Sequence, residues 1–425
     1  MSQALHDYLA ACTRLDAFNG AVAVRVHGQL LAQAAAGVAD AASGRRNTPA
    51  TPFRIASLSK SFTAAAVLKL AQQGALALDA PITDTLRDWP QLAGISVRQL
   101  LQHCSGLGNF TALPDYWPTR MQQPHTPPQL IDAVLAAQPL LPAGEVRYSN
   151  TGYALLALLV ERSSGQPFAD YLRNAFWQPL GLHATQCEIA APQRERALGH
   201  HLSPGLDAAM PVDMSVMYGA GSLSATVADL TRWAWALASG QVLDAAHTAA
   251  MFAHVPGNAC MGWWRDDGVY AGQERRVWGH LGDVNGYTAA SLLLPDEGIS
   301  VVVLGNIGFV PQLPLARQLA ALALGEPATL PQAPLAAMPQ PWGDGEYRAT
   351  DGATAVLAGD LLTLVRDYGV PCTQRLLPTA HGADTQHWRA AQLPEQYLLQ
   401  RHGNAVQLQS SNARGETRVF TRVAA

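Results

Sequence analysis

Lysine is nearly absent from this chain of 425 residues, in which Lys60 and Lys69 are the only two among 28 Lys and Arg side chains. Arg stays protonated at any working pH, whereas burial and neighbouring groups can lower the pKa of a Lys until it releases a proton. Lys60 lies three residues after Ser57. A chain that uses Arg almost everywhere, yet has Lys at this position, indicates proton chemistry at a serine hydroxyl.

Other patterns that the chain lacks exclude whole classes of site. Its five cysteines are scattered, without a C-x-x-C pair, which argues against a disulfide framework. H-E-x-x-H is absent and the pair His200–His201 has no Cys or carboxylate at ligand spacing, so we expect no metal and no cofactor. No G-x-S-x-G occurs, and the α/β-hydrolase fold needs that nucleophile turn.

Charge and hydropathy exclude further partners. A formal net charge of -4 leaves no basic surface for nucleic acid or for anionic lipid. No apolar run reaches the roughly 18 residues of a membrane span. The first residues lack the charged and apolar regions of a secretory signal, which predicts a cytoplasmic location. Hydrophobic residues make up 48% of the chain, enough for a large core, and the length favours two or three domains.

The first 325 residues mix helical and strand patterns. We expect helices over 3–14, 57–73, 151–162, 226–237 and 315–324. We expect strands over 20–26, 29–36, 277–279, 287–294 and 299–304. The first two strands form a hairpin around His27–Gly28, and Thr226 with Asp229 resembles a capping box.

Composition changes after residue 325. Five prolines follow closely and predict a stiff linker over 326–341: Pro327, Pro331, Pro334, Pro339 and Pro341. Beyond it, short alternating strands are expected over 355–357, 361–365, 396–400, 405–408 and 417–423. The chain therefore divides into a large domain over 1–325, the linker, and a small all-β domain over 342–425, a barrel or sandwich.

Ser57 and Lys60 fall at the predicted start of a helix. Free backbone N–H groups give this end of a helix a positive potential. Lys60, one turn later, lies on the same helix face and can reach the Ser57 hydroxyl. A serine hydroxyl becomes a strong nucleophile only when a base takes its proton. The neighbouring Ser59 and Ser61 are expected to pack or to cap the helix.

Two later segments add to this pair. The first is Tyr148-x-Asn150 and the second is His280-x-Gly282. With Ser57-x-x-Lys60 before them, they resemble the three motifs of serine β-lactamases and penicillin-binding proteins. The resemblance covers residues 15 to 325, and Tyr-x-Asn resembles the class C β-lactamase, D-aminopeptidase and esterase branch. Three supporting stretches also look typical of the family, at 100–107, 178–182 and 219–223.

The resemblance implies a fold and a catalytic set. The fold is an α+β arrangement with an antiparallel sheet flanked by helices and a helical subdomain, followed here by a lipocalin-like all-β domain. Ser57 would attack a carbonyl and form an acyl-enzyme that water later hydrolyses. Tyr148 and Lys60 are the candidate bases, and the sequence leaves open which of them takes the proton.

The resemblance also implies a substrate-binding set of Asn150, His280, Gly282 and Asp283. Asn150 would hold the Lys60 amine and a substrate amide. The backbone N–H groups of Ser57 and Asp283 would form the oxyanion hole.

His280 departs from the Lys that β-lactamases and carboxypeptidases usually have at this place. Neutral imidazole offers one donor and no permanent charge, which weakens recognition of a substrate carboxylate. The leading hypothesis is therefore a serine hydrolase acting on small D-amino-acid amides or short peptides. The alternatives are a carboxylesterase or a β-lactamase/DD-peptidase on the same scaffold, and a non-catalytic binding protein. The C-terminal domain is expected near the active-site mouth, where it would limit substrate size; the oligomeric state stays open.

Overall fold

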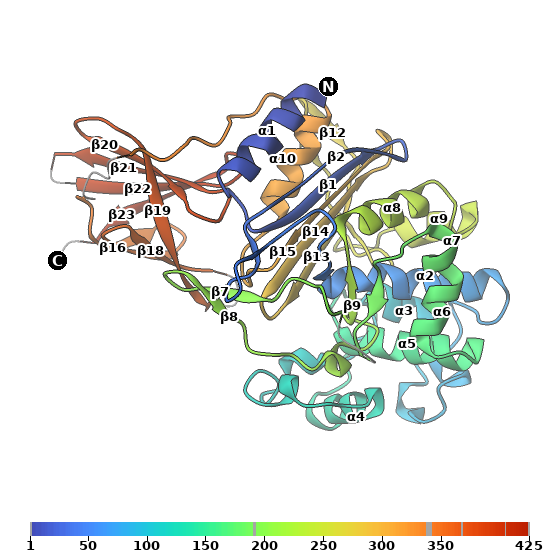
Figure 1. The fold of residues 1–425 in the computed structure, drawn as a ribbon. Coiled ribbons are helices and arrows are strands. Elements are labelled where there is room, and N and C mark those ends of the chain that lie inside the picture. Colours follow the sequence, from blue (N-terminus) through green and yellow to red (C-terminus); the bar gives the residue numbers. More distant parts are fainter. Residues whose placement is uncertain (1, 190–192, 337–341, 367–368, 404, 424–425) are drawn as a thin grey trace.

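The computed structural model describes the whole chain except residues 1, 190–192, 337–341, 367–368, 404 and 424–425 (Figure 1). Its centre is a six-stranded antiparallel sheet in the order β10-β13-β14-β15-β1-β2. The strands span β1 (Gly20–Val26), β2 (Gln29–Ala36), β10 (Trp264–Arg265), β13 (Trp278–Val284), β14 (Tyr287–Leu294) and β15 (Ile299–Gly305). The N-terminal hairpin thus pairs with the last strand of the large domain.

Both faces of this sheet are covered. Side chains along a strand alternate between faces, so Val301 and Val303 join a core with α1 (Ser2–Arg14) and α10 (Leu313–Ala323). Val302 and Leu304 join the opposite core, with α8 (Val227–Ala238) and the helical subdomain. Strands buried on both faces read as continuous apolar runs, which is how β14 and β15 appear in the sequence.

The helical subdomain lies against one face of the sheet (Figure 1). Its α-helices are α2 (Ser59–Gln72), α3 (Val97–Leu101), α4 (Pro127–Ala137), α5 (Asn150–Ser164), α6 (Phe168–Leu172), α7 (Gln178–Leu180) and α9 (Ala245–Phe252). Short turns of 3-10 helix are η1 (Ala56–Leu58), η2 (Ile82–Asp84), η3 (Pro90–Leu92), η4 (Phe110–Ala112), η5 (Arg120–Gln122) and η7 (Met214–Met217), and η6 (Arg173–Trp177) is a π-helix. Helix α2 is buried on all sides over its first ten residues, as its apolar sequence requires.

Small sheets of two or three strands lie beside these layers. They comprise β3 (Val38–Asp40), β4 (Arg45–Arg46), β5 (Phe53–Arg54), β6 (Gln186–Cys187), β7 (His200–Leu202), β8 (Leu206–Ala208), β9 (Leu223–Ala225), β11 (Gly268–Tyr270) and β12 (Gln273–Arg275). The three-stranded sheet β5-β9-β6 matters most, because β5 leads directly into the turn that contains Ser57.

The C-terminal part is a closed antiparallel barrel of eight strands, which confirms the predicted all-β domain. The strands are β16 (Gly345–Ala349), β17 (Thr354–Ala358), β18 (Leu361–Val365), β19 (Pro371–His381), β20 (Thr385–Ala390), β21 (Gln396–His402), β22 (Ala405–Ser411) and β23 (Thr417–Arg422). Three of them, β16, β19 and β20, were not predicted. The longest of them, β19, contains Pro378, and proline within a sequence argues against a strand. The register of β19 shifts just after Pro378, and a bulge of this kind tolerates proline.

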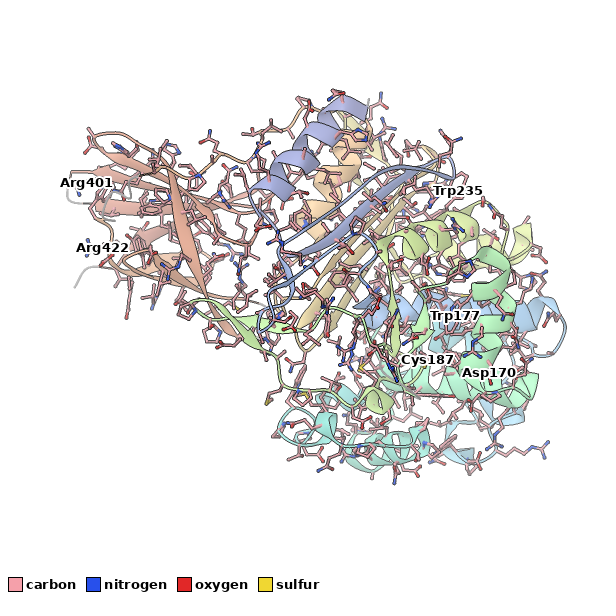
Figure 2. The ribbon with its side chains drawn as sticks, in the orientation of Figure 1. Asp170, Trp177, Cys187, Trp235, Arg401 and Arg422 are labelled. Atoms are coloured by element: carbon pink, nitrogen blue, oxygen red, sulfur yellow. The ribbon has the colours of Figure 1, made fainter. Side chains whose placement is uncertain are left out.

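Several predictions of local structure can be compared directly. The hairpin is confirmed to the residue: His27 and Gly28 both have positive φ, the conformation of a tight two-residue turn. Trp235 from α8 lies against this turn (Figure 2). The predicted capping box is half formed, because Thr226 accepts from the Asp229 N–H while the Asp229 carboxylate binds another loop. In the described part of the chain, no helix combines the length and the apolar composition that crossing a membrane requires.

Candidate active site

A cavity of about 540 Å³ opens between β13 and the helical subdomain. It brings together residues that lie more than 220 positions apart in the chain. Of the predicted site residues, five line it: Ser57, Tyr148, Asn150, His280 and Asp283. Lys60 is completely buried beside Ser57. All lining residues lie between positions 57 and 313, so no described residue of the barrel lines the cavity, and its expected role in limiting substrate size stays a prediction. The barrel packs on Leu202, Ile307 and Val310 of the large domain. Figure 2 shows Arg401 and Arg422 on the barrel, far from the central six-stranded sheet.

Ser57 lies in a turn of 3-10 helix, one turn before the helix predicted to contain it. Strand β5 ends at Arg54, and Ala56 then adopts a left-handed φ of 46°. Such a conformation costs free energy in a non-glycine residue and is typical of functional turns. The turn aims Ser57 into the cavity while α2 starts behind it. As expected, Ser59 and Ser61 act structurally: Ser59 Oγ accepts from the Leu223 N–H, and Ser61 Oγ donates to the Leu58 carbonyl.

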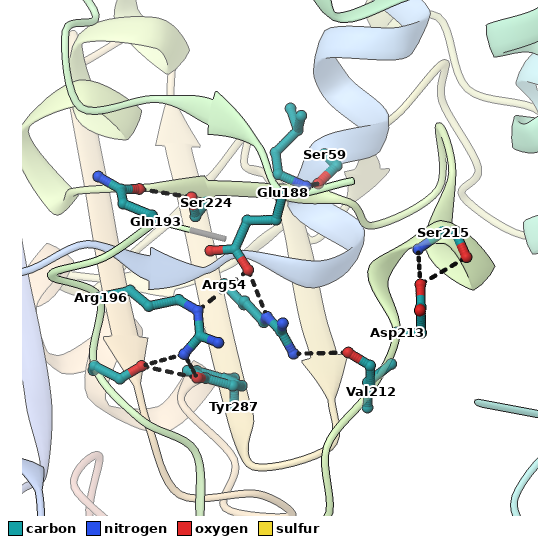
Figure 3. A network of polar contacts seen from close by, with 12 residues as sticks. Arg54, Ser59, Glu188, Gln193, Arg196, Val212, Asp213, Ser215, Ser224 and Tyr287 are labelled. Carbon is teal, nitrogen blue, oxygen red and sulfur yellow. Dashed lines mark hydrogen bonds and ion pairs between the residues drawn. The ribbon is translucent and has the colours of Figure 1, made fainter. Parts of the chain in front are cut away.

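A buried ion-pair network fixes the strand that precedes this turn (Figure 3). Arg54 Nε donates to Glu188 Oε2 at 2.8 Å, and Arg196 Nε donates to the same oxygen at 3.3 Å. Arg196 also reaches the Tyr287 hydroxyl on β14 at 3.0 Å. The Glu188 side chain is fully buried, and loss of one partner from a buried ion pair costs about 3–5 kcal/mol. The network therefore ties the nucleophile turn to the central sheet.

Gly282 does not line the cavity, which corrects its expected role in binding substrate. A Cβ added to Gly282 would lie 2.4 Å from the Ile55 carbonyl oxygen. Glycine at this position lets the backbone of β13 approach the nucleophile turn. Strand β13 also runs on to Val284, so His280 and Asp283 lie within a strand and not beyond its end.

Lys60 forms three hydrogen bonds, and none of the ion pairs found among the described residues involves it. Its Nζ lies 2.7 Å from Asn150 Oδ1, 2.7 Å from the Ala220 carbonyl oxygen and 3.0 Å from Ser57 Oγ. Burial lowers the pKa of Lys60 well below its usual value, because a desolvated ammonium is costly. A neutral amine has two N–H bonds, which the two carbonyl oxygens accept. Its lone pair then faces the Ser57 hydroxyl.

Tyr148 lies on the cavity side of the nucleophile. Its hydroxyl is 2.7 Å from Ser57 Oγ, and its side chain is 37% exposed. The Tyr148 hydroxyl can donate to Ser57 Oγ while the Ser57 hydroxyl donates to the lone pair of neutral Lys60. Each hydroxyl proton then has one acceptor. Asn150 holds Lys60 through Oδ1, as expected. Its Nδ2 donates to Asn109 Oδ1 at 3.2 Å.

His280 is 5% exposed and differs from its predicted behaviour in one respect. Its Nδ1 lies 2.6 Å from the Leu281 carbonyl oxygen. Since a carbonyl oxygen only accepts, Nδ1 has the proton and Nε2 has a lone pair. Nε2 has no hydrogen-bond partner among the described side chains and backbone. Burial is the main cause that lowers the pKa of His280 to about 3. The free ring nitrogen of His280 is therefore a buried acceptor, where the sequence predicted one donor.

Sequence reasoning missed two residues that support this site. Asn109 binds both the backbone N–H and the side chain of Asn150. His103 packs against the Tyr148 ring with centroids 4.5 Å apart. For His103, the available signal was the stretch 100–107, which looked typical of the family but received no role; Asn109 lies just beyond that stretch. Among residues outside the masked segments, no three His, Cys, Asp or Glu side chains form a group that could hold a metal ion.

Comparison with known proteins places this geometry in a family. The family model described as Beta-lactamase matches residues 10–326. Putative penicillin-binding protein PbpX of Bacillus subtilis is 26% identical over 265 residues, 60% of this chain and 64% of that protein. Among solved structures, the octameric penicillin-binding protein homologue of Pyrococcus abyssi has a TM-score of 0.67 at 22% identity, covering 98% of this chain and 99% of that one. That similarity reflects the fold alone.

A second solved structure is similar to the large domain. D-amino acid amidase of Ochrobactrum anthropi SV3, in complex with D-phenylalanine, has a TM-score of 0.64 at 27% identity. The match covers 76% of this chain and 100% of the amidase. The chain thus belongs to the beta-lactamase family and is a serine hydrolase.

Proposed function

We propose that this protein hydrolyses amides of small apolar D-amino acids through an acyl-enzyme on Ser57. The observation that carries the proposal is His280, a buried neutral imidazole where the family's carboxylate-binding members usually have Lys. A neutral imidazole has no charge with which to attract a substrate carboxylate. Similarity to the D-amino acid amidase supports the choice of substrate.

The hydrogen bonds support an order of proton transfers. Ser57 Oγ attacks the amide carbonyl carbon, and its proton moves to the Lys60 lone pair 3.0 Å away. The backbone N–H groups of Ser57 and Asp283 hold the oxyanion. The Tyr148 hydroxyl then protonates the leaving nitrogen and recovers a proton from the Lys60 ammonium, and the C–N bond breaks. Water attacks the resulting ester by the reverse sequence and releases the acid.

The cavity walls favour an apolar substrate side chain. Its lining includes the aromatic and apolar side chains Tyr116, Trp117, Met121, Val212, Met217 and Trp264. A volume of about 540 Å³ lies within the usual range for a small molecule. Burial of an aromatic or aliphatic substrate side chain there contributes roughly 1.5–3 kcal/mol.

A panel of matched substrates tests the proposal. We expect turnover of D-phenylalanine amide above that of L-phenylalanine amide and of D-Ala-D-Ala, and none with Ser57→Ala. A fluorophosphonate probe should add its mass to the peptide that contains Ser57. Labelling of another serine, or hydrolysis of p-nitrophenyl esters with no amide in the panel turned over, would overturn the proposal; the second result would favour the carboxylesterase.

The dependence on pH follows from the buried amine. Protonation removes the Lys60 lone pair, so kcat/KM should fall as pH falls through the lowered pKa of Lys60. His280 cannot cause this limb, because its pKa of about 3 keeps it neutral there. Profiles from about pH 4 to pH 10 should therefore show the same acid limb in wild type and His280→Gln. A limb that moves by about one pH unit or more in His280→Gln would contradict the assignment.

A further inference from the structure

His103 makes three contacts with the segment that contains Tyr148, the residue that faces the nucleophile Ser57. Its carbonyl oxygen accepts from the Arg147 N–H at 2.7 Å, and its ring Nδ1 accepts from the Ser149 N–H at 3.2 Å. These two amides flank Tyr148 in the chain. The His103 ring itself packs on the Tyr148 ring, with centroids 4.5 Å apart and planes inclined by 35°.

The segment that follows His103 continues the same contact. Backbone carbonyls of Cys104 and Gly106 accept from the N–H groups of Gly144 and Leu141, at 2.8 and 3.0 Å. Gly106 has a φ of +71°, and a Cβ on it would lie 2.0 Å from the Leu141 carbonyl oxygen. Glycine is therefore required for this close approach. Residues 103–109 therefore run beside the loop that leads to Tyr148 and hold it by hydrogen bonds.

Tyr148 needs such support because of its own surroundings. Its side chain is 37% exposed on the cavity side, so little packing restrains it there. Trp264 lies farther from the Tyr148 ring, with centroids 6.4 Å apart, and stacks against His103 at 5.9 Å. His103 is thus the nearest aromatic group to the Tyr148 ring among those that the structure describes.

We propose that His103 is a positioning residue that holds Tyr148 in hydrogen-bonding distance of Ser57. The proposal rests on the role of Tyr148 given above and assigns no chemistry to His103 itself. Nδ1 must stay unprotonated to accept from Ser149. Burial is the main cause that lowers the pKa of His103 well below its usual value and so keeps the ring neutral.

The test compares variants that remove or keep the Nδ1 acceptor. His103→Leu loses the acceptor and should lower kcat about 100-fold, since a misplacement of about 1 Å at a catalytic group has that effect. KM should change by less than about twofold, because binding of the ground state does not depend on Tyr148. His103→Asn places Oδ1 near the position of Nδ1 and should recover much of the loss. His200→Leu is the matched control, since His200 is equally buried but contacts Asn306 and Ala41.

A double-mutant cycle separates positioning from a general loss of stability. In a Tyr148→Phe background, His103→Leu should have almost no further effect on kcat, because no hydroxyl remains to be placed. The same 100-fold loss in that background, or a kcat for His103→Leu close to that of wild type, would overturn the proposal. Labelling of Ser57 by a fluorophosphonate is a second readout. The rate of labelling should fall in His103→Leu whether or not amides are the substrates. A wrong substrate class would therefore leave this result unchanged, and the two proposals can be tested separately.

Discussion

Lys60→Arg should lower kcat by about 10⁴-fold or more, the range seen when a serine hydrolase loses a group of its catalytic unit. Arg is always charged and cannot give up a proton to become a base. Lys60 Nζ is also enclosed by Asn150, Ala220 and Ser57 within 3.0 Å. A planar guanidinium has no room there. The measurement is kcat for an amide substrate, with the melting temperature recorded for each variant.

The chain contains its own matched control for this result. Lys69, the only other lysine, lies on the same helix and donates to the Val242 carbonyl at 3.0 Å, outside the cavity. Lys69→Arg should leave kcat unchanged. If Lys60→Arg does not fold, Lys60→Met keeps the site neutral and should show the same loss. A kcat for the folded Lys60→Arg within about tenfold of wild type, which is only about 1.4 kcal/mol, would mean that Lys60 is structural.

His280→Lys should move the enzyme toward substrates that bear a free carboxylate. A charge-assisted hydrogen bond contributes about 1.5–3 kcal/mol, which corresponds to roughly a tenfold to hundredfold change in kcat/KM. The wild type should prefer a peptide amide to the matched peptide acid, and the variant should narrow or reverse this preference. The measurement is the ratio of kcat/KM for the two substrates.

A neutral replacement serves as the control here. His280→Gln introduces no charge, so it should change turnover without a shift toward the acid. A wild type that already prefers the acid by about tenfold or more would contradict the argument. It would favour the carboxypeptidase or β-lactamase alternative for this chain.

The sequence predicts what depends on short-range pattern. The β1–β2 hairpin follows from two apolar runs and the His27–Gly28 turn, and its bounds are confirmed. The barrel follows from alternating strands, although the proline in β19 hides one of them. The three motifs predict which residues meet, because each has chemistry and spacing of its own.

What the sequence does not predict depends on contacts between distant segments. Glu188 and Arg54 are 134 positions apart, and nothing local to either indicates the pair. The lone pair of His280 depends on where the Leu281 carbonyl points, which only the strand geometry determines. His103 lies 45 positions before Tyr148, and only the folded structure shows that its segment contacts the loop that contains Tyr148.

The pairing of β1 with β15 also has a consequence for synthesis on the ribosome. β1 ends at Val26 and its neighbour β15 begins at Ile299, so one edge of the N-terminal hairpin stays unpaired while the intervening residues are made. At the usual 5–20 residues per second this takes about 15 to 60 s. An apolar strand with an open edge is prone to pair with other chains. Nascent chains of this protein should therefore depend on chaperones until the second half of the sheet emerges.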